Sequence, residues 1–217
     1  FYPKTSLFYD CLTSYEEDGL CAALPTPEEI RLNFPNPCGW RTGMEDSMLN
    51  GAPMLMAVCD RFAATGDAAL AGAASKIFEG MKRCARTGSK CGFLARSLSP
   101  FDGHSHYINS SRDQYTLFVY AAWRFYHSAL STAEQKTDLA EILAEFAGLF
   151  EQEAVPENDY TLLRLDGGRA LVSELWGQAV MPHESLRLPM VYAAAWSVTG
   201  DRRWHALYRR YAEDGVA

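Results

Sequence analysis

Apolar residues recur three or four positions apart along most of the chain, and this spacing predicts pairs of helices joined by short turns. The first helix of the first pair covers Met48 to Ala63, and a second helical pattern follows it. Thr65-Gly66-Asp67 interrupts the two patterns. Gly66 suits a helix C-cap with positive φ, and Asp67 can cap the start of the next helix. Pro53 lies inside the first helix, so we expect a kink or a later start there.

The same turn sequence returns at Thr199-Gly200-Asp201, again between two segments with helical spacing. A further pair of helices lies between these two turns, and its junction offers Ser131 or Thr132 as a helix cap. The turns repeat every ~65–70 residues, as in an array of helical hairpins. The sequence therefore predicts an all-α fold of consecutive αα-hairpins near 45–85, 113–153 and 184–214, in a single domain over residues 1–217.

The segments between these hairpins are long and have a different composition. Residues 33–43, 88–111 and 155–183 are rich in Pro, Asn and Gly and also carry aromatic side chains. Long loops in a compact domain are usually functional or disordered, and the aromatic content argues against disorder. We therefore expect the function to lie on these loops.

Composition and charge narrow the classes of protein further. The chain is 48% hydrophobic and 22% charged, which is an ordinary globular balance. Its net charge of -7 counts against binding to nucleic acid, which needs a basic face. No apolar run reaches the ~18 residues that a membrane span requires, so we expect a soluble protein that does not bind membranes.

The six cysteines show no metal-ligand spacing, because no Cys-x-x-Cys occurs among them. Six free thiols are the favoured interpretation, with a Cys84–Cys91 disulfide as the alternative. The cysteines do not decide between an oxidising and a reducing compartment, and a periplasmic or secreted location is favoured over a cytoplasmic one. Signature sequences of nucleotide-binding, serine-hydrolase and zincin sites are missing, and no cofactor is predicted.

Three features together suggest a family. They are the two Thr-Gly-Asp hairpins, the segment Gly39 to Asp46 and the segment Tyr107 to Tyr115, both of which lead into a helix. With these features the chain resembles the six-hairpin (α/α) toroid superfamily of glycoside hydrolases and polysaccharide lyases, although it matches no single family in it. The resemblance implies inner helices around an axis, with a cleft for an oligo- or polysaccharide at the end where the long loops lie.

A full ring of six hairpins would need about twice this length at the period seen here. The resemblance thus implies about half of an (α/α)6 toroid, a fragment of a larger one. Because each hairpin buries its face on its neighbours, three of them leave open apolar flanks. We expect the remaining half of the toroid, or another domain or subunit, to cover those flanks.

Acidic residues at helix starts are the first candidates for catalysis. Glu45 and Asp46 precede one predicted helix, and Asp113 stands at the equivalent place in the next hairpin. Glycoside hydrolysis needs two carboxyl groups across the scissile bond, and in a toroid these helix ends converge on one cleft. The pairing of Glu45 or Asp46 with Asp113 is therefore our acid/base hypothesis. The alternative is that all three only cap their helices.

A second hypothesis is β-elimination from a uronate-containing polymer. Tyr107 or His106 would remove the proton, and Arg112 or Arg96 would neutralise the carboxylate. The alternative is that the His and Tyr side chains bind sugar hydroxyls or pack the loop. The pair His104 and His106 lacks a third ligand at a suitable spacing, so no metal site is predicted. A third hypothesis is a helical-repeat binding scaffold without catalysis.

Side chains on or beside the long loops are the candidates for binding substrate, because aromatic faces stack on sugar rings and polar groups bind hydroxyls. This set comprises Trp40, Arg41, Arg96, His104, Gln114 and Tyr115. Phe93, Phe101 and Tyr107 lie on the same loops, but isolated aromatic residues are more often core anchors. Aromatic residues inside the predicted helices are expected in the core, namely Trp123, Phe125, Tyr126, Trp196 and Trp204.

Overall fold

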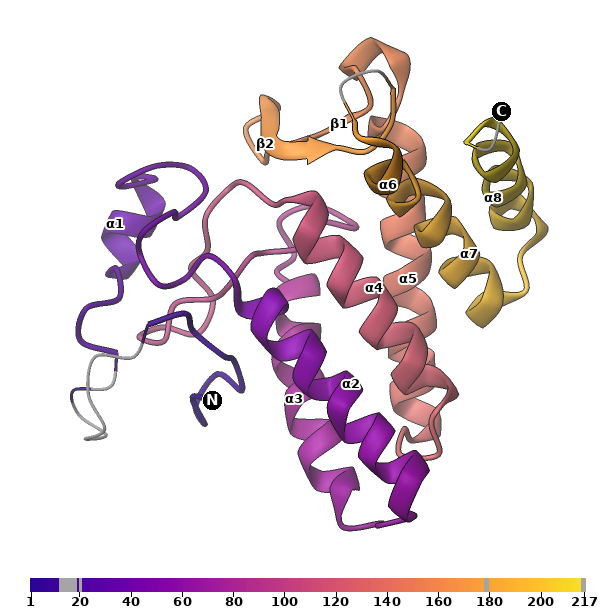
Figure 1. Ribbon diagram of the computed structural model, residues 1–217. Coiled ribbons are helices and arrows are strands. Elements are labelled where there is room, and N and C mark those ends of the chain that lie inside the picture. The colour runs from indigo at the N-terminus through magenta and orange to yellow at the C-terminus, as the bar shows by residue number, and fades with distance from the viewer. Residues whose placement is uncertain (12–18, 20, 178–179, 216–217) are drawn as a thin grey trace.

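A computed structural model describes residues 1–11, 19, 21–177 and 180–215, and it is mostly helical (Figure 1). The prediction of an all-α fold of consecutive helical hairpins is confirmed. The three hairpins are α2 (Ser47–Thr65) with α3 (Leu70–Ala85), α4 (Arg112–His127) with α5 (Ala133–Glu153), and α7 (Arg187–Thr199) with α8 (Arg202–Asp214).

Short elements occupy the connections between the hairpins. They are α1 (Pro27–Arg31), a 3-10 turn (Pro156–Asn158), strands β1 (Thr161–Leu163) and β2 (Arg169–Glu174), and α6 (Pro182–Ser185). The two strands pair antiparallel, with Thr161 opposite Glu174 and Leu163 opposite Arg169. This small β-hairpin was not predicted from the sequence. It stands over the start of α4 and contacts it through β2 (Figure 1).

The two Thr-Gly-Asp turns fold in the same way. Gly66 and Gly200 end their helices in the left-handed conformation, with φ of 67° and 71°, as predicted for a C-cap. The preceding threonine donates its hydroxyl to a carbonyl four residues earlier and accepts the amide of the following aspartate in both turns. The repeated sequence therefore encodes a repeated turn.

Two details differ from expectation, one in a turn and one inside helix α2. Asp201 caps α8 by accepting the amide of Arg203 at 2.8 Å, but the corresponding Asp67 caps only a turn that precedes α3. Helix α2 begins before Pro53 and continues through it, so the later start did not occur. At the third junction Thr132 is the N-cap, as predicted, in a capping box with Gln135.

The first helices of the three hairpins run in the same direction. In Figure 1, α2, α4 and α7 all begin at the upper end and descend, and α4 packs between the other two. The long connections therefore gather at the upper end, while the short turns of the hairpins lie at the other end. This arrangement brings the starts of α2, α4 and α7 to one face of the molecule.

Aromatic side chains contribute to the core both within and between the hairpins. Phe78 of α3 meets Phe125 of α4 across two hairpins, at 5.4 Å between ring centroids, and Phe118 of α4 meets Phe146 of α5 within one hairpin at 5.2 Å. None of the described helices combines the length and the apolar character that a membrane span requires. The six cysteines are unpaired, so the Cys84–Cys91 disulfide is not formed.

Candidate functional site

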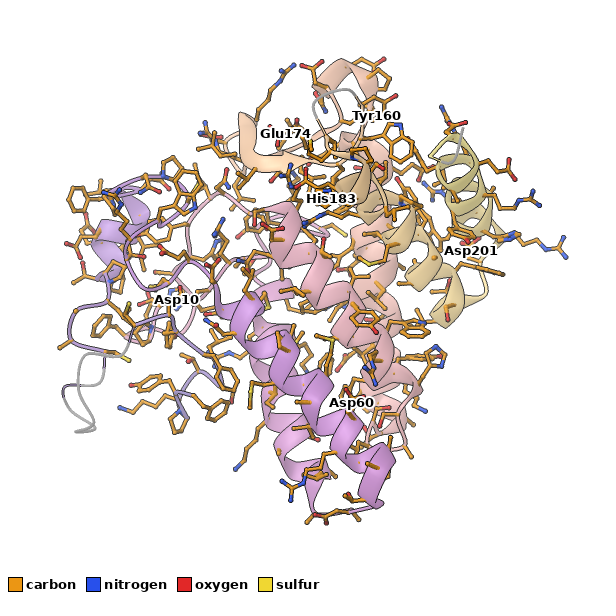
Figure 2. The ribbon with its side chains drawn as sticks, viewed as in Figure 1. Asp10, Asp60, Tyr160, Glu174, His183 and Asp201 are labelled. Atoms are coloured by element: carbon orange, nitrogen blue, oxygen red, sulfur yellow. The ribbon has the colours of Figure 1, made fainter. Side chains whose placement is uncertain are left out.

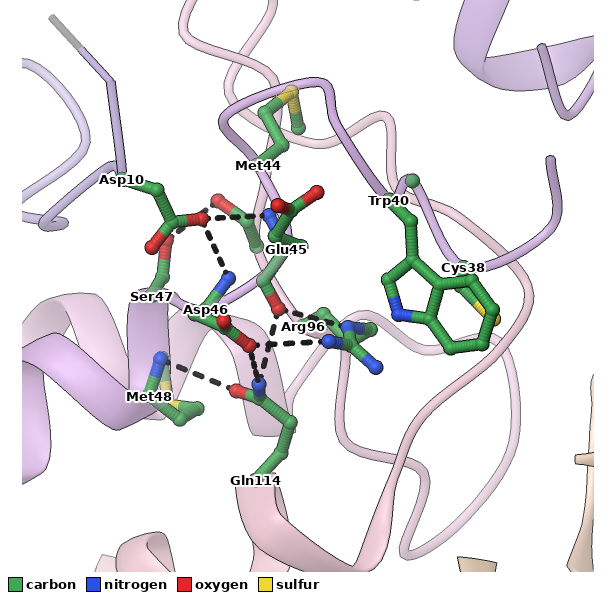
Figure 3. Close-up of polar contacts among 12 residues, drawn as sticks. Asp10, Cys38, Trp40, Met44, Glu45, Asp46, Ser47, Met48, Arg96 and Gln114 are labelled. Atoms are coloured by element: carbon green, nitrogen blue, oxygen red, sulfur yellow. Dashed lines mark hydrogen bonds and ion pairs between the residues drawn. The ribbon is translucent and has the colours of Figure 1, made fainter. Parts of the chain in front are cut away.

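Asp46 lies at the start of α2 and is held from two other segments (Figure 3). Its Oδ1 accepts hydrogen bonds from Arg96 Nη2 at 3.1 Å and from Gln114 Nε2 at 2.9 Å. The same two side chains donate to the carbonyl oxygen of Glu45, at 2.8 Å and 3.0 Å. Arg96 and Gln114 are buried, whereas the Asp46 side chain is 35% exposed. A rigid, buried support thus presents one carboxylate to the surface.

The capping alternative for Asp46 is not what the structure shows. Asp46 occupies the N-cap position but makes no capping hydrogen bond with its side chain. Gln114 takes that role, because its Oε1 accepts the first-turn amide of Met48 at 3.3 Å. Asp10 holds the segment just before the helix, since its Oδ2 accepts the amides of Glu45 at 3.1 Å and Asp46 at 2.9 Å. Burial, and then the neighbouring Asp46 carboxylate, raise the pKa of Asp10 above its ordinary value. Asp10 could not be predicted as a neighbour of this site, because it lies 35 residues before Glu45 and carries no local signal.

Glu45 points back into its own loop. Its Oε2 accepts the amide of Thr42 at 3.3 Å, and Thr42 donates its hydroxyl to the carbonyl of Gly39. Asp46 is therefore the carboxylate of this pair that Arg96 and Gln114 orient. Of the two candidates that the sequence left open, the structure favours Asp46.

The guanidinium of Arg96 has a donor without a partner. Its Nη1 is buried and makes no hydrogen bond, although the side chain is otherwise bound to Asp46 and Glu45. Figure 3 shows the indole of Trp40 on the side of this guanidinium away from Asp46. Trp40 is 38% exposed, so an aromatic surface borders the site.

Asp113 faces a different neighbour from the one predicted. It forms an ion pair with Arg187 at the start of α7, and Arg187 also donates to Thr116 Oγ1 at 3.2 Å. The next residue, Gln114, is the one that reaches Asp46. Successive helical residues point about 100° apart, since one turn takes 3.6 residues. No contact among the described residues joins Asp113 to Glu45 or Asp46. Catalytic carboxyl groups of glycoside hydrolases stand about 5–9.5 Å apart, so their pairing across a substrate stays a prediction.

Arg112 links the start of α4 to the β-hairpin and to α6. Its Nη2 lies 2.5 Å from Glu184 Oε1, and its Nη1 lies 3.5 Å from Glu174 Oε2. Both carboxylates were missed by the sequence analysis. Gly167-Gly168 between two short apolar runs is a hairpin signal that would have placed Glu174 at the end of a strand. Arg112 is thus already paired with two carboxylates, which makes it a less suitable group for neutralising a uronate.

Tyr107 and His106 do not have the environment of a catalytic base. The hydroxyl of Tyr107 donates to the carbonyl of Phe34 at 2.7 Å, and burial raises the pKa of Tyr107 to about 12. His106 is bound at both ring nitrogens, to Tyr107 O and Ser89 Oγ at 3.0 Å each, and burial lowers its pKa. These contacts support the alternative that both side chains pack the loop.

Other predicted binding residues divide between surface and core. Tyr115 was predicted to bind substrate, but its side chain is fully buried against Phe146 and Phe150. Phe93 is buried as well. Arg41 and His104 are exposed, and His104 lies 3.5 Å from Asp102 Oδ2. Phe101 is exposed on its loop.

Of the aromatic residues inside the helices that were predicted to lie in the core, one is exposed. Phe125 and Trp204 are buried as predicted, and Trp123 and Tyr126 pack against the core while partly exposed. Trp196 is 38% exposed instead. It borders an apolar pocket of about 670 Å³ between α4 and α7.

Within the part of the chain that the structure describes, no three His, Cys, Asp or Glu side chains are grouped as metal ligands would be. No family model, curated protein or solved structure matches the chain. The function must therefore be inferred from the geometry of the site alone.

Proposed function

We propose that this chain is part of a carbohydrate-active enzyme, and specifically of a glycoside hydrolase. The observation that carries the proposal is the set of partly exposed carboxylates where α2, α4 and α7 begin. Each carboxylate is paired with an arginine from another segment: Asp46 with Arg96, Asp113 with Arg187, and Glu174 with Arg112.

This arrangement suits the chemistry of glycoside hydrolysis. One carboxylic acid protonates the leaving oxygen, and a second carboxylate acts as base or nucleophile on the other face of the sugar. Hydrogen bonds from buried groups keep such carboxylates in a productive orientation, as Arg96 and Gln114 do for Asp46. We assign Asp46 and Asp113 as the acid/base pair, with substrate lying between the starts of α2 and α4.

The surface at the starts of α2, α4 and α7 favours a polyhydroxylated substrate. Carboxylates at this end are each paired with a guanidinium group, and the exposed indole of Trp40 offers a stacking face. Elimination receives less support, because Tyr107 is buried with a raised pKa and Arg112 is already paired. A binding scaffold without catalysis is the remaining alternative.

The proposal includes completion of the ring, in which these three hairpins form about half of an (α/α)6 toroid. It is supported by exposed aromatic residues on the flank of α4 and α7. Tyr120 and Trp196 are exposed there, and both line the apolar pocket of about 670 Å³. We infer that further hairpins cover this face.

The first test is hydrolysis of neutral and uronate-containing oligosaccharides by the wild-type chain and by Asp46→Asn and Asp113→Asn. New reducing ends and the ultraviolet absorbance of a conjugated double bond are followed together. We expect reducing ends without absorbance, and a loss of about 100-fold or more in each variant, because a positioned acid or base contributes that much.

Asp60→Asn is the matched control. Asp60 is an exposed aspartate that is also paired with an arginine, Arg124, but it lies on the lower part of α2, far from the site (Figure 2). We expect its activity to equal that of the wild type. Full activity in both site variants would contradict the assignment. Absorbance that rises with the reducing ends would indicate elimination. Neither reducing ends nor absorbance with any of the oligosaccharides would favour the binding scaffold.

A further inference from the structure

The β-hairpin above the start of α4 lines one side of an open pocket of about 630 Å³. We call it the hairpin pocket, and its side chains include Asp159, Tyr160, Arg169, Glu174 and Trp176. Figure 2 shows Tyr160 and Glu174 on this part of the molecule. A volume of this size is typical of small-ligand sites in proteins.

The two aromatic side chains of the hairpin pocket are held from behind. Trp176 meets Tyr211 of α8 edge to face, with ring centroids 5.1 Å apart. The ring of Tyr160 lies against Gly177, where an added Cβ would come within 3.5 Å of it. Both rings pack on the core yet stay partly exposed. They therefore offer fixed apolar surfaces to a ligand at little cost in side-chain entropy.

The charged groups of the hairpin pocket are paired and do not favour an anion. Arg169 forms an ion pair with Asp159 at 2.5 Å, so its charge is offset within the pocket. Glu174 adds a second carboxylate, which is paired in turn with Arg112 at 3.5 Å. An anionic ligand therefore finds no unpaired arginine here, whereas neutral hydroxyl groups can bind both carboxylates and guanidinium.

The hairpin pocket adjoins the candidate site. Glu174 lies in the pocket wall and also contacts Arg112 Nη1 at 3.5 Å, at the start of α4. The residue after Arg112 is Asp113, one of the two proposed catalytic groups. An extended ligand could therefore occupy both places at once.

We propose that the hairpin pocket binds one ring of a neutral oligosaccharide, at a distance from the bond that is cleaved. Tyr160 and Trp176 contact the apolar face of the sugar, and Arg169 with Glu174 binds its hydroxyl groups. This inference rests on the proposed function, which supplies the substrate class. It narrows that class to neutral oligosaccharides as opposed to uronate-containing ones.

The test measures binding directly, by calorimetry with neutral oligosaccharides and their uronate-containing counterparts. The wild type is compared with Tyr160→Ala and Trp176→Ala. Because Trp176 packs on Tyr211, Arg169→Ala is added as a variant at an exposed position that leaves the core intact. Trp196→Ala is the matched control, since it removes an exposed aromatic side chain from a different pocket.

We expect the wild type to prefer neutral oligosaccharides and Tyr160→Ala to bind them about tenfold more weakly, as loss of one aromatic contact predicts. Arg169→Ala should weaken binding by a smaller factor, and Trp196→Ala should leave it unchanged. This pattern supports the inference even if no hydrolysis is seen, in which case only the proposed function fails. Equal binding by the pocket variants overturns the inference even if the chain hydrolyses sugars. A preference for uronate chains, or no binding of any neutral chain, also overturns it.

Discussion

Tyr115 shows how a single side chain can attach a long loop to a helix. From a fully buried position on α4, its hydroxyl donates to the carbonyl of Gly92 at 2.9 Å and accepts the amide of Leu94 at 3.0 Å. Arg96, which supports Asp46, follows two residues later in the same loop. The position of the candidate site therefore depends on a residue that does not take part in it.

His106 gives the loop a dependence on pH. Burial lowers its folded-state pKa below the ordinary 6.5, so protonation favours the unfolded chain. The stability that neutral His106 contributes is present above pH 6.5 and is lost as the pH falls through the lowered pKa. We expect the melting temperature to drop in that window, and the drop to be smaller in His106→Gln.

His104→Gln is the control for this prediction. His104 is exposed on the same loop, so the wild-type drop should persist in that variant. Thermal unfolding across the acid range measures all three proteins. An identical pH dependence in wild type and His106→Gln would show that other groups cause it.

At the scale of elements, helix α3 carries two glycines with opposite surroundings. A Cβ at Gly80 would lie 1.9 Å from the carbonyl oxygen of Ser6, so the N-terminal segment packs directly on the helix backbone there. A Cβ at Gly72, two turns earlier, would meet nothing within 4 Å. One glycine is needed for close packing, and the other only weakens the helix.

Substituting each glycine by alanine separates these effects. Gly72→Ala should stabilise the chain by about 0.5–1 kcal/mol, which is the difference in helix propensity. Gly80→Ala should destabilise it by about 1–3 kcal/mol, because the N-terminal segment must move away. Chemical denaturation followed by circular dichroism measures both. A stabilised Gly80→Ala variant would show that the N-terminal segment does not pack on α3.

The helices could be predicted from the sequence because their signals are local. Thr132 and the glycines of the Thr-Gly-Asp turns set helix ends through contacts within a few residues. The small β-hairpin escaped prediction because its strands are short. The partner of Asp113 escaped prediction for another reason: it depends on which helix stands beside α4, and spacing along one segment does not report that.

At the scale of the molecule, three parallel helices present their N-termini at one end (Figure 1). Helix N-termini carry partial positive charge, and this offsets part of the acidity of a chain with net charge -7. Acidic side chains can therefore gather at this end at a lower electrostatic cost than elsewhere on the surface.

The exposed flank of α4 and α7 leads to a prediction about assembly. If further hairpins normally cover it, the 217-residue chain alone should self-associate through its aromatic residues. We expect sedimentation velocity to show concentration-dependent association, and Trp196→Asp to weaken it. Trp40→Asp, which changes an equally exposed tryptophan at the other end, serves as control. A chain that stays monomeric at every concentration would argue against an uncovered face.

The separation of short turns from long loops has an evolutionary consequence. The Thr-Gly-Asp turns form their hydrogen bonds within a few residues, so these turns do not depend on the residues at the opposite end. Insertions and substitutions in the long loops can then accumulate without disturbing the frame. Descendants of one ancestral hairpin array can thus diverge in what they recognise while retaining the same helical frame.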